Sequence, residues 1–188
     1  MENGEREGMT AGRVLAIIRD VERRLADEAI REVLEERLVA AREALAAGPA
    51  DWAMQRVPLA LFGAGLPKEL RASRVSVFRG GSAARIERHE NADQFSCLLR
   101  GALTIHVLEG GSWQARQFRA AGSAQQRISY VARGLWHHPV CPATGDCELV
   151  GFHTVPAAEL IDEYAATRAE VEGVVREPQR HLDGRDKI

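Results

Sequence analysis

A short alternating segment near the middle of the chain carries several side chains that can take part in chemistry. Side chains two positions apart in a β-strand point to the same side, so Arg85, Glu87 and His89 share one face. The turn-like residues 90–93 let Gln94 begin the returning strand, where it can lie close to His89 across the pair. Carboxylate, imidazole and amide groups on one face of a hairpin indicate a site for a metal ion or a polar ligand.

This segment is the first of two stretches whose residue spacing resembles that of the cupin superfamily motifs. The first stretch reads Gly81-x5-Glu87-x-His89-x4-Gln94-x6-Gly101, and the second reads Gly134-x2-His137-x3-Cys141. In cupins the two motifs read Gly-x5-His-x-His-x3–4-Glu-x6-Gly and Gly-x5-Pro-x-Gly-x2-His-x3-Asn. The glycines, His89 and His137 match, whereas Glu87 replaces the first His, Gln94 the Glu, Ala132 the Pro and Cys141 the Asn. The resemblance extends over residues 74–154.

The resemblance implies a mainly β fold, the cupin-type double-stranded β-helix or jelly-roll barrel. In such a barrel His137 arrives from a distant strand and joins Glu87, His89 and Gln94 as the metal ligands. Two imidazoles and one carboxylate with open positions suit non-haem Fe(II), which we favour, and also Mn, Ni or Zn. Because Gln94 supplies only a neutral amide oxygen, the alternative is a metal-free barrel that keeps a pocket for a small ligand.

Two further residues near these motifs keep more than one interpretation. His153 lies in the last alternating segment, where a role in the pocket, in packing or at the surface stays open. Cys141 occupies the position of the family's Asn and could line the cavity. His138 follows His137 directly, so it is expected to face away from the site.

The residues from Arg74 to Thr154 predict an all-β core around these motifs. Short runs of alternating apolar and polar residues are separated by glycines at nearly regular intervals, which is typical of an antiparallel sandwich or barrel. Strands are expected within residues 75–78, 84–89, 95–99, 103–108, 113–118, 128–131 and 149–154.

Helical periodicity flanks this core on its N-terminal side. Apolar residues recur at helical spacing over 11–47, and the phase slips near Asp27, which can cap a new helix, so two helices are predicted. Gly48 and Pro49 end the helical stretch. Residues 51–70 have the composition of a linker that packs against the rest of the chain.

The C-terminal side returns to helical spacing over residues 157–175, and a polar tail that we expect to fray follows. The sequence therefore predicts three parts. They are an N-terminal helical extension and linker (1–70), a cupin β-barrel (71–156), and a C-terminal helix and tail (157–188).

Composition narrows the class of protein. With 25 basic and 27 acidic residues among 188, the formal net charge is −2, which argues against a nucleic-acid partner. No apolar run approaches the roughly 20 residues that span a bilayer, so no membrane partner is expected. Three cysteines without CxxC spacing indicate free thiols and a cytoplasmic protein.

The expected function is that of a small metal-dependent enzyme. Oxygenase chemistry of the dioxygenase type comes first, with a lyase or isomerase as the alternative within the enzyme class. Residues 71–140 contain ten arginines and four acidic residues, so the β core is positively charged. Arg85 shares a strand face with Glu87 and His89, and it is the predicted substrate-binding residue for a small anionic molecule.

We also predict a homodimer, because cupins commonly pair through their sheets and the N-terminal helices carry more apolar surface than one barrel end needs. The alternative is that these helices cap the barrel of their own subunit. Sedimentation of the full-length chain should give twice the monomer mass. A monomer at high micromolar concentration would contradict the prediction.

Overall fold

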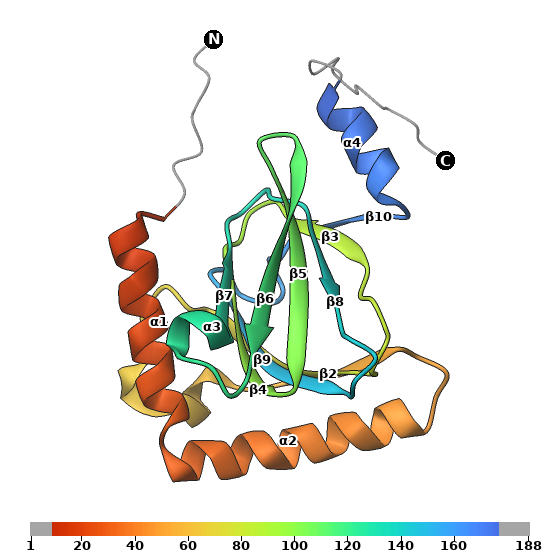
Figure 1. The fold of residues 1–188 in the computed structure, drawn as a ribbon. Coiled ribbons are helices and arrows are strands. Elements are labelled where there is room, and N and C mark those ends of the chain that lie inside the picture. Colours follow the sequence, from red (N-terminus) through yellow and green to blue (C-terminus); the bar gives the residue numbers. More distant parts are fainter. Residues whose placement is uncertain (1–8, 177–188) are drawn as a thin grey trace.

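The computed structural model describes residues 9–176, which form two antiparallel five-stranded sheets with helices outside them (Figure 1). In spatial order, the first sheet contains β1 (Trp52–Arg56), β2 (Ala72–Phe78), β9 (Cys147–His153), β4 (Gln94–Arg100) and β7 (Ile128–Val131). The second sheet contains β10 (Asp162–Ala165), β3 (Ile86–His89), β8 (His137–Val140), β5 (Ala102–Glu109) and β6 (Ser112–Arg119). The helices are α1 (Ala11–Leu25), α2 (Glu28–Ala46), the 3-10 helix η1 (Leu59–Gly65), α3 (Ala124–Arg127) and α4 (Arg168–Arg176).

The strand order confirms the predicted jelly-roll barrel. From β2 to β10 the chain alternates between the two sheets at every connection except β5–β6, which forms a hairpin within one sheet. β3 and β4, expected to pair across a turn, therefore lie in different sheets, and His89 and Gln94 approach each other across the barrel interior. Gly101, which separates β4 from β5, has a φ of 77°, and a Cβ atom there would lie 2.5 Å from the Asp146 carbonyl oxygen. The backbone can make this change of sheet because glycine has no Cβ.

The two N-terminal helices form as predicted and cover the outer face of the first sheet. The Asp27 carboxylate accepts a hydrogen bond from the Ala29 amide (3.1 Å) and caps α2. Apolar side chains of both helices belong to one buried cluster with outward-facing residues such as Val75 and Val150. These helices therefore cap the barrel of their own chain, and the homodimer stays a prediction.

The strands extend beyond the predicted barrel range of 71–156 at its N-terminal edge. Residues 51–70 were expected to be a packed linker, but Trp52–Arg56 forms β1, which pairs antiparallel with β2. Only the second half of this segment is irregular, and there Phe62 of η1 is buried against Phe152. The segment joins the sheet because β2 would otherwise present an unpaired edge.

The prediction of helix from residue 157 onward is wrong for its first part. Residues 162–165 form β10, which pairs with β3, and the helix α4 begins only at Arg168. Ile161 and Tyr164, which supported the helical spacing, are about half exposed. Pairing with the edge of the second sheet therefore overrides the local periodicity. The predicted frayed tail lies outside the described residues from 177 onward.

In the described part of the chain, no helix has the length and apolar character required to cross a membrane.

Phe62 gives a test of how firmly the segment between the helices and the barrel is packed. Its side chain is 1% exposed, with the ring centroid 5.2 Å from that of Phe152. Phe62→Ala should lower the free energy of unfolding by about 3–5 kcal/mol, because it leaves a cavity between η1 and the first sheet. Leu61→Ala, at a neighbouring exposed position, should cost less than about 1 kcal/mol in the same denaturant titration. Equal effects of the two changes would contradict the packing.

Candidate metal centre

A cavity of about 140 Å³ lies between the inner faces of the two sheets. The first sheet contributes Arg74, Ser76 and Gln94 to its wall, and the second sheet contributes Glu87 and His137. An enclosed cavity of about 150 Å³ can hold a benzene molecule, so this space fits a small organic compound.

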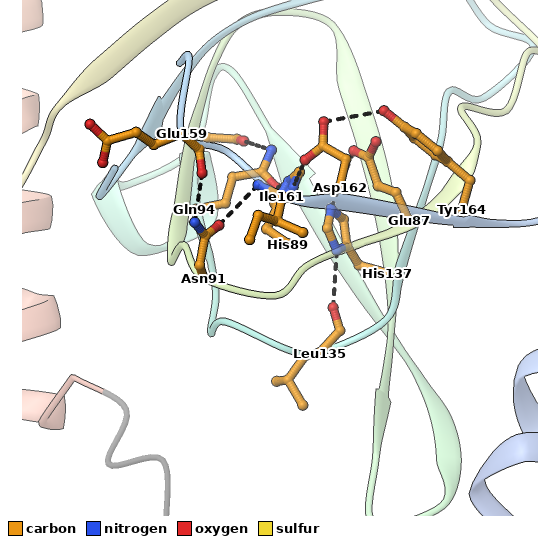
Figure 2. Close-up of polar contacts among 11 residues, drawn as sticks. Glu87, His89, Asn91, Gln94, Leu135, His137, Glu159, Ile161, Asp162 and Tyr164 are labelled. Atoms are coloured by element: carbon orange, nitrogen blue, oxygen red, sulfur yellow. Dashed lines mark hydrogen bonds and ion pairs between the residues drawn. The ribbon is translucent and has the colours of Figure 1, made fainter. Parts of the chain in front are cut away.

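Glu87, His89 and His137 come together at one end of this cavity. One ligand atom from each residue lies within 4.8 Å of the others. The Glu87 carboxylate is 3.4 Å from His137 Nε2, and His89 Nε2 is 3.0 Å from Gln94 Oε1. The structure thus brings all four residues predicted as metal ligands into one cluster, and Figure 2 shows them converging from three strands, β3, β4 and β8.

The orientation of His89 is fixed by a carboxylate that the sequence prediction missed. Asp162 Oδ1 lies 2.6 Å from His89 Nδ1, so this nitrogen donates a hydrogen bond to the Asp162 carboxylate (Figure 2). The other ring nitrogen, Nε2, is left facing Gln94. A histidine that donates one ring proton to a carboxylate is the usual arrangement in metal sites, because the contact fixes the tautomer and the ring plane.

Backbone pairing and the turn after β3 place Asp162 at this position. In the β10–β3 ladder Asp162 is the partner of His89. The Asn91 side chain accepts a hydrogen bond from the Ile161 amide (3.0 Å) and donates one to the Glu159 carbonyl (2.7 Å), as Figure 2 shows. Residues 161–165 show no regular alternation of apolar and polar side chains, so the sequence carried no clear signal of this strand.

His137 is held by the strand that carries the second motif. It is the ladder partner of Glu87, and its Nδ1 lies 3.2 Å from the Leu135 carbonyl oxygen, to which it can donate. The Gly134 amide donates to the His89 carbonyl (2.8 Å), which ties the second motif to the first. His137 Nε2 is fully buried and forms no hydrogen bond within residues 9–176. The lone pair on this nitrogen is therefore directed toward the Glu87 carboxylate, 3.4 Å away, which has no proton to donate to it.

Burial and neighbouring charges set the protonation of the cluster. Burial would raise the pKa of Glu87, but the contact with His137 and the charges of His89 and Arg74 together hold it below its usual value. Burial, with the proximity of His137, lowers the pKa of His89 despite Glu87 and Asp162. A carboxylate beside a neutral imidazole is the protonation state that binds a metal ion.

These residues fit a divalent ion. In octahedral sites with metal–ligand bonds of about 2.1 Å, neighbouring ligand atoms are about 3 Å apart. The 3.0 Å and 3.4 Å separations in this cluster are close to that value. An ion would also satisfy the orphaned nitrogen of His137.

The remaining candidates take other positions. Arg85 is exposed at the rim of the cavity, where its guanidinium carbon lies 5.3 Å from the ring centroid of Tyr164. Its role in substrate binding stays a prediction. Cys141 is buried in a core cluster, and its thiol donates to the Gly145 carbonyl (3.4 Å), so it does not reach the cavity. His138 faces outward, as predicted, and contacts Arg168.

His153 is buried behind the cluster. Its ring lies edge-on to that of His89, with centroids 4.8 Å apart. Burial, followed by the charges of Arg74, His89 and His137, lowers the pKa of His153 to about 2, so the ring is neutral. Of the roles left open by the sequence, the structure supports packing against His89.

The strand topology and the placement of both motifs around one cavity show a cupin fold. No family model and no curated protein matches the chain. Among solved structures it is similar to oxalate oxidase in complex with the substrate analogue glycolate, with 16% identity and a TM-score of 0.48 over 61% of this chain and 56% of that chain. It is also similar to a mutant of Bacillus subtilis oxalate decarboxylase, with 12% identity and a TM-score of 0.48 over 62% of this chain and 29% of that chain. Pumpkin pro-11S globulin matches with the same identity, TM-score and coverage, and the matched part is less than two thirds of each of these three chains.

The contact between Asp162 and His89 leads to a testable prediction. Asp162→Asn should weaken metal binding by about 10–100-fold, because the His89 ring loses the partner that fixes its tautomer. Glu163→Gln is the matched control, since Glu163 is adjacent in sequence and pairs with Arg88 away from the cluster. Calorimetric titration of the chelator-treated protein with Fe(II) or Mn(II) would measure both variants. Equal affinities would show that Asp162 does not support the site.

Proposed function

We propose that the protein is a metal-dependent enzyme in which Glu87, His89 and His137, with Gln94, hold a divalent ion at one end of the barrel cavity. The observation that carries this proposal is the convergence of three donor atoms within 4.8 Å, one of them a buried nitrogen without a partner. Fe(II) is the favoured ion, because two imidazoles and one carboxylate with open positions suit it; Mn, Ni or Zn are the alternatives.

Bound there, the ion would act as a Lewis acid or activate dioxygen toward a small molecule in the cavity. The protein residues would supply the surroundings of that chemistry. Asp162 keeps the His89 ring in one orientation, and the Leu135 carbonyl does the same for His137. The sheets enclose the cavity and limit access of water, while Arg85 at its rim would attract an anionic substrate. A dioxygenase-type oxidation is our first choice of reaction, and a lyase or isomerase reaction is the second.

A metal-free ligand-binding protein is the second candidate, and one contact favours it. His89 Nε2 and Gln94 Oε1 are 3.0 Å apart, and a half-turn of the Gln94 amide would let its NH2 group donate to Nε2 without an ion. In this case the same cavity would bind a small molecule without converting it.

Metal analysis separates these functions. Protein purified without chelator should contain a divalent metal ion by elemental analysis, and His89→Ala and His137→Ala should each lower its occupancy by about tenfold or more. His138→Ala is the matched control, because His138 is adjacent to His137 and faces outward. Full metal occupancy in both the His89 and the His137 variant would contradict the proposed metal site. The absence of bound metal from the unmodified protein would favour the metal-free, ligand-binding function.

Enzymatic activity needs its own measurement. The metal-loaded protein should consume dioxygen with a member of a panel of small carboxylic acids, and chelation should abolish this consumption. Product formation from a panel compound without oxygen uptake would assign the lyase or isomerase reaction instead. Binding of a panel compound without turnover would contradict an enzymatic role.

A further inference from the structure

We propose that Arg74 and Ser76, two positions apart on the inner face of β2, bind the carboxylate group of the cavity's ligand. This inference deepens the proposed function, on which it rests for the identity of the cavity as the active site. It names the ligand as a compact monocarboxylic acid with an apolar body. Arg85, which the sequence predicts to bind an anion, lies at the rim of the cavity instead.

Strand register places Arg74 in the wall of the cavity. Arg74 is the ladder partner of Gly151 on β9, and Gly151 is the partner of Ser96 on β4. Side chains at paired positions point to the same face of a sheet. Because Gly151 has no side chain, Arg74 and Ser96 are the two side chains that this row presents to the cavity.

The charge of Arg74 has no direct protein partner. Within residues 9–176 its guanidinium forms no hydrogen bond and no ion pair, although the residue is partly buried. Other arginines of the barrel pair with carboxylates, such as Arg88 with Glu163 (2.6 Å) and Arg116 with Glu109 (2.5 Å). A half-buried cation without a counter-ion in contact is costly, and a carboxylate ligand would offset that cost through a bidentate contact.

The hydroxyl of Ser76 is a second polar group in the cavity that lacks a protein partner. The residue is 3% exposed and lines the cavity, and in the described part of the chain its hydroxyl has no hydrogen-bond partner. Hydroxyl groups of buried serines normally find a partner, so this hydroxyl is available to donate to a ligand oxygen. Arg74 and Ser76 together offer the charge and the donors that one carboxylate group requires.

The wall beyond Ser76 is apolar, which defines the rest of the ligand. Leu149 is the ladder partner of Ser76, and Phe78 follows on the same face of β2. On the opposite sheet, Leu103 and Ile105 line the same cavity. The cavity is therefore polar toward the metal-ligand cluster and apolar at its other end, and its volume of about 140 Å³ fits a body the size of a benzene ring.

Benzoate and benzamide form a matched pair of probes, because they have the same shape and differ in charge. The full-length protein should bind benzoate more tightly than benzamide in calorimetric titrations. Arg74→Met keeps most of the apolar stem and removes the charge, so benzoate affinity should fall about tenfold or more while benzamide affinity changes less than about twofold. Ser76→Ala should lower benzoate affinity by a smaller factor, about two- to fivefold.

Two further variants act as controls. Arg71→Met removes the same charge from an exposed position just before β2 and should leave both affinities unchanged. Gly151→Val should lower benzoate affinity, because a Cβ atom there would already contact the Arg74 stem and the added methyl groups would displace the guanidinium. A Cβ atom at Gly151 would lie 3.8 Å from its nearest neighbour, so the backbone can accept the change and the thermal transition should persist.

The outcomes separate this inference from the proposed function. All titrations are run on metal-loaded and on chelator-treated protein, with metal content measured for each variant. Metal binding with benzoate affinity that is insensitive to Arg74→Met would overturn the carboxylate site alone. Arg74-dependent benzoate binding in protein that takes up no metal would support the carboxylate site and overturn the metalloenzyme. The absence of benzoate binding to the unmodified protein at about 10 mM would also overturn the carboxylate site.

Discussion

The buried imidazole of His89 is the group on which the arrangement of the site depends. Its two ring nitrogens contact Asp162 on one side and Gln94 on the other, and its ring packs at nearly a right angle against that of His153. A buried polar ring is stable only when its nitrogens have partners, so the elements that carry these partners must meet at one place. The pairing of β10 with β3 and the return of β4 after the turn both serve this requirement.

The outward and inward faces of the first sheet have different roles. On the first sheet, outward-facing side chains pack against α1, α2 and η1 and form a large apolar core. Inward-facing side chains of the same strands, including Arg74, Ser76 and Gln94, line the cavity. Because alternate residues of a strand face opposite sides, stability and ligand binding are assigned to different residues of the same strands. The outer face can therefore supply the stability that a polar cavity lacks.

The arginines of the barrel also differ in role, according to whether they have a carboxylate partner. The excess of arginines over acidic residues between positions 71 and 140 suggested an anionic ligand. In the structure, arginines such as Arg88 and Arg133 pair with carboxylates of neighbouring segments. Net charge therefore said little about the ligand, and the informative feature is the lack of a direct partner for one guanidinium inside the cavity.

From the sequence by itself, local periodicity and motif spacing were enough to predict the residues of the cluster. Only the tertiary structure decided how distant segments pair. Alternation placed Glu87 and His89 on one face, the turn at 90–93 brought Gln94 back toward His89, and motif spacing added His137 through the resemblance to cupins. β1 and β10, in contrast, form by pairing with the edge of an existing sheet, so their own sequences carried weak signals. The contact of Asp162 with His89 and the placement of Arg74 beside Gly151 arise from register between strands that are far apart in sequence. Register is set by the packing of whole sheets, so the residues proposed to orient the metal ligands and to bind a carboxylate can be identified only when the barrel is closed.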